Sequence, residues 1–163
     1  MSARAAWRLE SLGFGEVYEY VAGKLDWMSA GLPTQGTNAA QPRAGEVSRK
    51  DVPTARLTDR LGDVRERVRP LGWDAVVVTN DERVVLGLLR SKELAKDPDL
   101  TMEQAMRPGP STFRPYVAIK EMADYMANHM LESSPITTSD GRLVGLLLQK
   151  DAIRMAGGKL NER

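Results

Sequence analysis

The chain has no cysteine, and it has one histidine among its 163 residues. The first absence excludes disulfides, thiolate metal sites and cysteine nucleophiles, and it fits a reducing compartment such as the cytoplasm. Because His129 is the only imidazole, a multi-histidine metal cluster is excluded, and no motif around it supports a Ser-His-acid triad. We therefore expect no catalytic residues, no metal site and no enzymatic activity.

Long hydrophobic runs are also missing. An apolar run such as residues 84–89 has the length of a strand, whereas a membrane-spanning helix needs about 20 apolar residues. The first seven residues lack the apolar stretch of a signal peptide. The balance of 23 basic and 22 acidic residues gives no electrostatic reason to expect nucleic acid or a membrane surface as a partner. We expect a cytoplasmic protein.

What the chain does contain is one pattern that occurs twice. Shifted by 58 positions, residues 53–94 align with residues 111–152 without a gap, and seven of the 42 pairs are identical. Apolar positions agree as well: Leu61 with Ile119, Val64 with Met122, Val68 with Met126. Such a repeat predicts two similar units that pack around a pseudo-two-fold axis, and the cleft between them is a natural ligand site.

Each unit has the same predicted order: short strand, helix, strand, tight turn, strand, helix. β-Branched runs and hairpin turns predict the strands, and apolar spacing of three and four predicts the helices. The segments in the first unit are 53–56, 61–68, 75–78, 84–89 and 92–96. Those in the second unit are 112–114, 119–130, 134–138, 143–148 and 150–155.

The chain before the repeats has a different character. We predict a helix over residues 2–12, a strand over 17–21 and a short helix over 25–28, and we expect Trp7 and Trp27 in a core. Residues 34–50 are polar, with Gly and Pro and almost no large apolar side chain. That composition predicts a mobile linker.

Two tandem units of this order and length resemble the CBS domain, named after cystathionine β-synthase, and together they resemble a CBS pair, or Bateman module. The most specific piece is the family motif Gly-hydrophobic-x-Thr/Ser-x-x-Asp. Residues 145–151 read Gly-Leu-Leu-Leu-Gln-Lys-Asp, and residues 87–93 read Gly-Leu-Leu-Arg-Ser-Lys-Glu. The resemblance implies a mixed α+β or α/β fold over residues 51–158, with β-α-β-β-α repeats at 53–96 and 111–157.

The resemblance also implies a ligand site. In family members that bind adenosine nucleotides, the motif aspartate holds the ribose hydroxyls, and the extended segment before the helix flanks the adenine. Carried over to this chain, the second-unit site consists of Thr112, Phe113, Arg114, Ser134, Gly145 and Asp151. Gly145 would permit close backbone approach. Asp151 also stands where a helix begins, so its alternative role is to accept hydrogen bonds from the amides there.

The first unit departs from the motif. Arg90 replaces the Thr/Ser, as Leu148 does in the second unit, and Glu93 replaces the Asp. Arg90 has two possible roles, pairing with a phosphate or facing solvent. Glu93 would reach ribose hydroxyls only from a longer arm. We therefore expect the second unit, with Asp151, to carry the better site.

A second resemblance concerns residues 1–33, which look like the last third of a rhodanese domain. The matching pieces are Ala3-Arg4-Ala5-Ala6, Gly23-Lys24-Leu25-Asp26-Trp27 and Ala30-Gly31-Leu32-Pro33. In that family a cysteine just before this segment carries sulfur as a persulfide. The chain as given has no cysteine, so it cannot carry out this transfer.

Three functions follow from the sequence. The first is a non-catalytic regulatory or sensor protein that binds an adenine-containing ligand, such as AMP, ADP, ATP or S-adenosylmethionine, between the repeats. The second is a ligand-independent dimerisation module. Its support is the stripe Met122, Met126 and Met130, which suits either a core or a homodimer face of repeat helices. The third and most distant is a remnant of a rhodanese-type sulfurtransferase.

Overall fold

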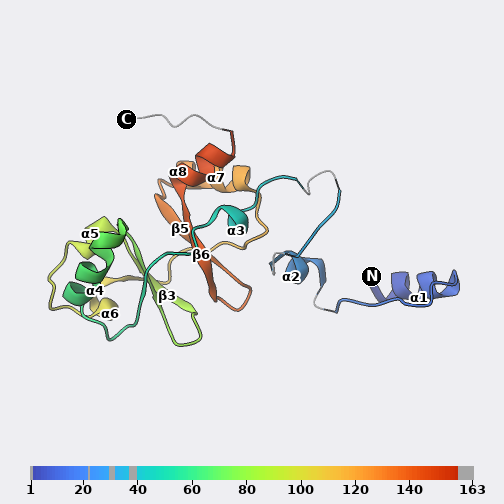
Figure 1. Ribbon diagram of the computed structural model, residues 1–163, viewed down its shortest axis with the longest axis horizontal. Helices are drawn as coiled ribbons and strands as arrows, with labels where there is room; N and C mark the ends of the chain where they lie inside the picture. The colour runs from blue at the N-terminus through green and yellow to red at the C-terminus, as the bar shows by residue number, and fades with distance from the viewer. Residues whose placement is uncertain (1, 22, 30–31, 37–39, 158–163) are drawn as a thin grey trace.

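The computed structural model describes residues 2–21, 23–29, 32–36 and 40–157. Figure 1 shows two α+β units side by side and an N-terminal arm that leads away from them. The elements in chain order are α1 Ser2–Ser11, α2 Gly23–Ser29, α3 Ala44–Val47, β1 Thr54–Ala55, α4 Leu61–Val68, a 3-10 turn Arg69–Leu71, β2 Val76–Thr79, β3 Val85–Leu89, α5 Ser91–Leu94, α6 Met102–Ala105, β4 Arg107–Pro108, α7 Ile119–Asn128, β5 Ser133–Thr137, β6 Leu143–Leu148 and α8 Gln149–Met155. The predicted order of strands and helices in the two repeats is confirmed, except that the strand predicted at residues 112–114 is reduced to a single bridge at Phe113.

Two sheets form the centre of the two units. The first has the order β1-β2-β3-β4, with β1 parallel to β2 and the other pairs antiparallel. The second sheet pairs β5 with β6, and Phe113 adds a parallel bridge to Ile136. The strand pairs β2–β3 and β5–β6 have the same register after a shift of 58 residues, because Val78 lies opposite Gly87 and Ile136 lies opposite Gly145.

Three apolar clusters hold the units together. One lies in the first repeat around Leu61, Val64 and Val68, and one lies in the second around Ile119, Met122 and Met126. These are the helix stripes that the sequence predicts. The third cluster joins the repeats, since it consists of Val52, Ala75, Val77, Leu88, Leu143 and Leu146 from both sheets. Burial of this shared cluster makes the pair one packed body.

The two units exchange short helices. Helix α3 precedes the first repeat but packs on the second, where Ala44 is fully buried and its N–H donates to the carbonyl of Val117 at 2.9 Å. Helix α6 precedes the second repeat but packs on the first, where the N–H of Met102 donates to the carbonyl of Asp59 at 2.9 Å. Ala44 and Met102 are 58 positions apart, so the repeat begins earlier than residue 53.

Part of the predicted linker therefore belongs to the pair. The sequence predicts a linker over residues 44–50, but these residues contain α3 and a bridge between Arg49 and Leu146. The physical reason is that the segment packs on the second repeat through small side chains. A Cβ on Gly45 would lie 2.5 Å from the Cβ of Pro115, so only glycine allows this approach. A search for large apolar residues misses such a contact.

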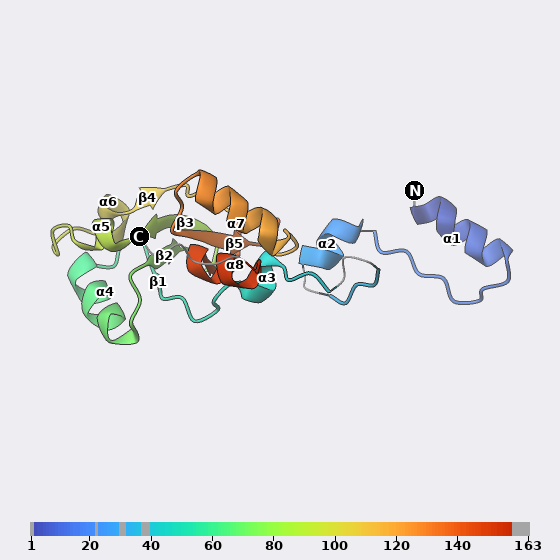
Figure 2. The ribbon, with the colours of Figure 1, turned by 90° about the horizontal axis from the view of Figure 1, so that it is seen from above.

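The N-terminal arm differs more from the prediction. Residues 17–21 form no strand, because no neighbouring strand pairs with them. Figures 1 and 2 both place α1 and α2 away from the repeats, and Trp7 is 68% exposed rather than in a core. Trp27 is 36% exposed, and its indole N–H donates to the carbonyl of Pro33 at 2.8 Å. Gly31 and Gly158, at which the sequence predicts that the helices over residues 25–28 and 150–155 end, lie outside the described residues.

The methionine stripe is shorter than predicted. Helix α7 ends at Asn128, and the positive φ of 52° at Met130 turns that side chain out of the stripe. Met130 is 88% exposed, whereas Met122 and Met126 are buried. The two buried methionines thus serve the core of the second repeat. Within the described ranges, no helix is both long and apolar enough to cross a bilayer.

Candidate functional site

Two buried carboxylates occupy equivalent places at the start of the last helix of each repeat. Glu93 lies on α5 and Asp151 lies on α8, and each residue is 4% exposed. An arginine from the exchanged segment holds each one. Arg107 Nε donates to Glu93 Oε1 at 2.6 Å, and Arg49 Nε donates to Asp151 Oδ2 at 2.8 Å. The two arginines are 58 positions apart, like the two acids.

The sequence prediction missed these arginines. Arg49 and Arg107 are identical residues 58 positions apart. Arg49 lies just before the aligned window 53–94, in the segment that the sequence predicts to be a linker. Extending the same shift upstream by a few residues would have found the pair. The signal was therefore present, but the low apolar content of residues 34–50 concealed it.

Both oxygens of Asp151 are bound, and Asp151 also lines a pocket of about 440 Å³ that is formed by α3, the chain before it and α8. Arg154 Nη2 donates to Asp151 Oδ1 at 2.8 Å, so both carboxylate oxygens accept from arginines and neither caps helix α8. The guanidinium of Arg49 lies 5.6 Å from the centre of the Trp73 ring, a cation–π contact that covers it further. The hydrogen bond from Arg49 to Asp151 raises the pKa of this arginine.

Gly145 does permit a close approach, but of the chain itself. A Cβ there would lie 2.7 Å from the carbonyl oxygen of Arg49 and 2.8 Å from Ser48 Oγ. The missing side chain thus admits the backbone of residues 48–49 beside β6. This is the contact that brings Arg49 within reach of Asp151.

The segment Thr112, Phe113 and Arg114 runs along the other strand of the second sheet. Phe113 bridges Ile136 on β5, and Arg114 Nη1 donates to Thr137 Oγ1 at 2.6 Å. Ser134, on the same strand, donates from Oγ to the carbonyl of Ser111 at 3.1 Å. These residues lie together along β5. They do not line the pocket that contains Asp151, because that acid follows β6 and faces the residues that pair with β6.

Glu93 also has both carboxylate oxygens bound, one by Arg107 Nε and the other by the backbone N–H of Arg90. A pocket of about 440 Å³, which we call the Glu93 pocket, is lined by residues of both repeats, including Arg90, Lys92, Glu93, Arg107, His129 and Glu132. Its wall contains Leu131, whose equivalent 58 positions earlier is Trp73. The smaller leucine leaves space where the indole of Trp73 covers Arg49.

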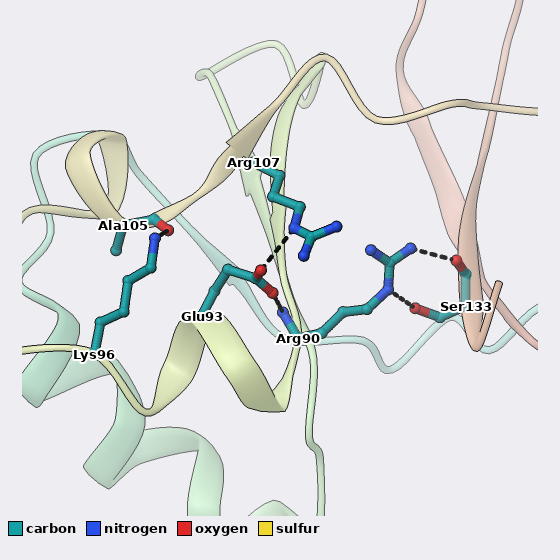
Figure 3. A network of polar contacts seen from close by, with 6 residues as sticks. All are labelled: Arg90, Glu93, Lys96, Ala105, Arg107 and Ser133. Atoms are coloured by element: carbon teal, nitrogen blue, oxygen red, sulfur yellow. Dashed lines mark hydrogen bonds and ion pairs between the residues drawn. The ribbon is translucent and has the colours of Figure 1, made fainter. Parts of the chain in front are cut away.

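Arg90 crosses from the first repeat to the second in this region. Figure 3 shows its guanidinium on Ser133, with Nε donating to Ser133 Oγ at 3.2 Å and Nη2 donating to the Ser133 carbonyl at 2.8 Å. Its backbone N–H donates to Glu93 Oε2 at 3.1 Å. Burial lowers the pKa of Arg90, and the nearby charge of Arg107 lowers it further.

Glu93 stays ionised in this environment. Burial raises the pKa of its carboxyl group, but the hydrogen bonds from the Arg90 backbone and from Arg107 outweigh burial. The net result is a pKa below the ordinary value. The charged form is therefore the one that the fold stabilises.

A second pocket, of about 330 Å³, lies where the repeats meet. Its lining contains equivalent pairs, Asp74 with Glu132 and Ala75 with Ser133, as expected for a position on the pseudo-two-fold axis. It shares Arg90 with the Glu93 pocket. The pocket where the repeats meet is thus lined by Arg90, whereas neither Glu93 nor Asp151 lines it. Within the described ranges, no three His, Asp or Glu side chains converge on a point that could hold a metal ion.

The model of the CBS domain matches this chain twice, over residues 44–100 and 99–158. The chain belongs to the CBS domain family. The first CBS match begins at Ala44, the first residue of the exchanged helix α3.

Two curated proteins are similar to this chain. An uncharacterized protein of Methanopyrus kandleri, MK0525, is 24% identical over 119 residues, which cover 68% of this chain and 61% of that protein. An inosine-5′-monophosphate dehydrogenase of Korarchaeum cryptofilum is 26% identical over 114 residues, which cover 69% of this chain and 24% of the enzyme. The chain thus spans less than two thirds of the length of these relatives.

Solved structures share the CBS pair fold. CBSX2 in complex with AMP superimposes with a TM-score of 0.64 at 17% identity, covering 71% of this chain and 96% of that one. The CBS pair of MJ0100 in complex with 5′-methylthioadenosine and S-adenosyl-L-methionine gives 0.64 at 17% identity, covering 72% and 97%. At these identities the likeness establishes the fold.

Proposed function

We propose that this protein is a non-catalytic regulatory or sensor protein whose CBS pair binds an adenine-containing ligand in the cleft between the repeats. Candidate ligands are AMP, ADP, ATP and S-adenosylmethionine. The site is the Glu93 pocket together with the adjoining pocket on the pseudo-two-fold axis. Arg90, which lines both, connects them.

The observation that carries this proposal is the lining of the Glu93 pocket, which comes from both repeats and shares Arg90 with the pocket on the pseudo-two-fold axis. Both motif acids are 4% exposed, have both oxygens bound and line pockets of about 440 Å³. The pocket of Asp151 is lined instead by α3, the chain before it and α8. A carboxylate fixed at a known position can accept hydrogen bonds from the two hydroxyls of a ribose, as the CBS motif acid does in nucleotide-binding relatives. The complexes of CBSX2 with AMP and of the MJ0100 pair with adenosyl compounds support the ligand class.

Thermal shift and calorimetry with the four candidate ligands test the proposal. A ligand that binds only the folded state raises the melting temperature as its concentration increases. We expect a shift with at least one of them, and we expect Glu93→Ala to abolish it. Asp151→Ala is the matched control, because it removes the equivalent acid from the other pocket. A site assigned to the wrong repeat would show the opposite pattern, and no response at millimolar ligand would refute the proposal.

Self-association is a second candidate function. Large apolar side chains remain exposed along the N-terminal arm: Trp7, Leu9, Leu12, Phe14, Tyr18, Tyr20 and Val21. Such a concentration of exposed apolar surface is typical of an interaction site. Sedimentation of the whole chain and of residues 34–163 distinguishes the cases. A dimer that needs the arm supports this function, and a monomer in both cases contradicts it. The rhodanese-like origin of residues 1–33 stays a prediction, since the CBS matches begin at residue 44.

A further inference from the structure

The tips of the two β-hairpins are joined to each other by backbone hydrogen bonds. The N–H of Val85 donates to the carbonyl of Gly141 at 3.0 Å, and the N–H of Leu143 donates to the carbonyl of Arg83 at 2.9 Å. Exchanging equivalent residues, 58 positions apart, turns each bond into the other, so the bridge lies on the pseudo-two-fold axis. Because main-chain groups make both bonds, this end of the pair is joined whatever side chains it carries.

The bridge holds Arg83 in a backbone conformation that its equivalent residue adopts as a glycine. The φ angle is 63° at Arg83 and 84° at Gly141. A residue with a side chain rarely adopts a positive φ, and it does so only where the surrounding structure imposes it. The carbonyl of Arg83 accepts from Leu143 in this conformation. The tips are therefore a fixed point between the repeats.

The opposite ends of the same hairpins are held in another way. They flank the pocket of about 330 Å³ on the pseudo-two-fold axis. Within the part of the chain that the structure describes, every hydrogen bond that joins the repeats at this end comes from Arg90, which donates to the hydroxyl and the carbonyl of Ser133. Figure 3 shows this side chain crossing from one repeat to the other. The equivalent residues, Leu148 and Ala75, have no polar side-chain atom with which to repeat the contact.

The contact of Arg90 with Ser133 is weak for a charged group. Burial lowers the pKa of Arg90, and the nearby charge of Arg107 lowers it further. The hydroxyl and the carbonyl that the guanidinium contacts carry no charge. Asp74 and Glu132, which are equivalent residues of the two repeats, both line the same pocket, and like charges on its two sides disfavour a closer approach. Besides the shared apolar cluster, little holds this end together.

We propose that the pair opens and closes at the end that contains the axis pocket. The backbone bridge between the hairpin tips is the hinge, and the side chain of Arg90 is the latch. When Arg90 leaves Ser133, the pocket widens while the tips keep their separation. The two states belong to the fold itself, so their equilibrium exists with or without a ligand. Failure of this inference and failure of the ligand proposal are therefore separate results.

Spin-label distances test the hinge, and the lack of cysteine in the chain makes the labelling specific. The pair Ala95→Cys and Met155→Cys reports the latched end, since both residues are exposed and neither lines the axis pocket. The pair Glu82→Cys and Asp140→Cys reports the tips. In an Arg90→Leu background we expect about tenfold more of the longer distance at the latched end, because one charge-assisted hydrogen bond contributes about that factor. The tip distance should not change.

The same measurement can refute each part. An unchanged distance at the latched end would overturn the latch, and equal broadening at both ends would overturn the hinge. Ser133→Ala removes the hydroxyl acceptor, introduces the residue found at the equivalent position, Ala75, and keeps the inference testable if Arg90→Leu fails to fold. It should increase the longer distance about threefold, because the carbonyl acceptor remains, and no increase would contradict the latch.

Arg69→Leu is the charge-matched control. Arg69 is exposed at the end of α4 and lines none of the three pockets described above. We expect this variant to leave both distances as they are in the wild type. A control that opens the latched end as much as Arg90→Leu would attribute the effect to net charge and overturn the latch.

Discussion

The buried carboxylate of Glu93 gives a quantitative prediction for folding stability. We consider Glu93→Gln, which preserves the shape of the side chain and removes its charge. In the native protein this carboxylate accepts a hydrogen bond of 2.6 Å from Arg107 Nε and one of 3.1 Å from the N–H of Arg90. The amide oxygen of the glutamine can accept one of these two hydrogen bonds. The amide NH₂ group then faces the N–H donor of the other bond and cannot accept it.

The magnitude follows from the exposure of the two partners. Removing one member of a buried ion pair costs about 3–5 kcal/mol, but that range assumes that the remaining charge stays buried. The side chain of Arg107 is 61% exposed, so water solvates it again once its partner is neutral. A loss near the value of one charge-assisted hydrogen bond, about 2 kcal/mol, is therefore expected at neutral pH. For a chain of this size that corresponds to a fall of roughly 4–8 °C in the melting temperature.

The pH dependence has a definite sign. The pKa of Glu93 in the folded protein lies below the ordinary glutamate value of 4.5, so the folded state binds fewer protons than the unfolded state as the pH falls through this region. The stabilisation is fully present above that value and is lost as the pH falls toward the folded pKa. The difference between the wild type and Glu93→Gln should accordingly shrink below pH 4.5.

Urea unfolding at pH 7, 5, 4 and 3.5 measures this difference. The control is Glu103→Gln, since Glu103 is an exposed acid on the neighbouring helix α6 and has no ion pair among the described residues. Its effect on the free energy of unfolding should be within about 0.5 kcal/mol at every pH. A Glu93→Gln deficit that stays constant from pH 7 to 3.5 would show that the charge of Glu93 contributes nothing to stability.

Three further predictions concern the exchanged helices and the Asp151 side. Gly145→Ala should destabilise the fold by about 1–3 kcal/mol, because the added methyl group meets a backbone carbonyl. The control Gly87→Ala should cost less, since the nearest atom there is the flexible Met106 sulfur, and urea unfolding measures both variants. Deleting residues 1–33 should leave the melting temperature of the pair unchanged within error, whereas deleting residues 1–47 should lower stability by about 2 kcal/mol through loss of buried surface on the second repeat; equal effects in calorimetric scans would contradict the exchange of α3. Arg154→Gln should change stability by less than about 1 kcal/mol in chemical denaturation, because the side chain of Arg154 is 68% exposed, and a larger loss would mean that its pairing with Asp151 is strongly desolvated.

The sequence predicted the fold of the pair well because its signal is local and repeated. Apolar spacing identified helices α4 and α7, and β-branched runs identified β2. A gapless shift of 58 residues then fixed how the elements correspond. The strand expected at residues 17–21 failed for the opposite reason. A strand needs a partner, and β-propensity alone carries no information about whether one is present.

The surroundings of the two motif acids could not be predicted from the motif alone. Both acids are held by arginines outside the motif, Asp151 by Arg49 and Glu93 by Arg107. Arg49 reaches Asp151, 102 positions away in the chain, because α3 packs on the second repeat. Each acid also lines a pocket of about 440 Å³, and the packing of the repeats decides which residues share that pocket.

The exchange of α3 and α6 also bears on how such a chain can arise and fold. Each unit lacks one helix of its own and receives the equivalent helix from the other, which is the arrangement of a domain-swapped dimer joined into a single polypeptide. An ancestral single unit could have completed its core only by pairing with a second copy. In the present chain, the helix that completes the second unit is α3, which is synthesised before the first unit. Its core therefore has to wait for contacts between segments more than 70 residues apart, such as Ala44 with Val117, and folding of the pair should be slow and all-or-none.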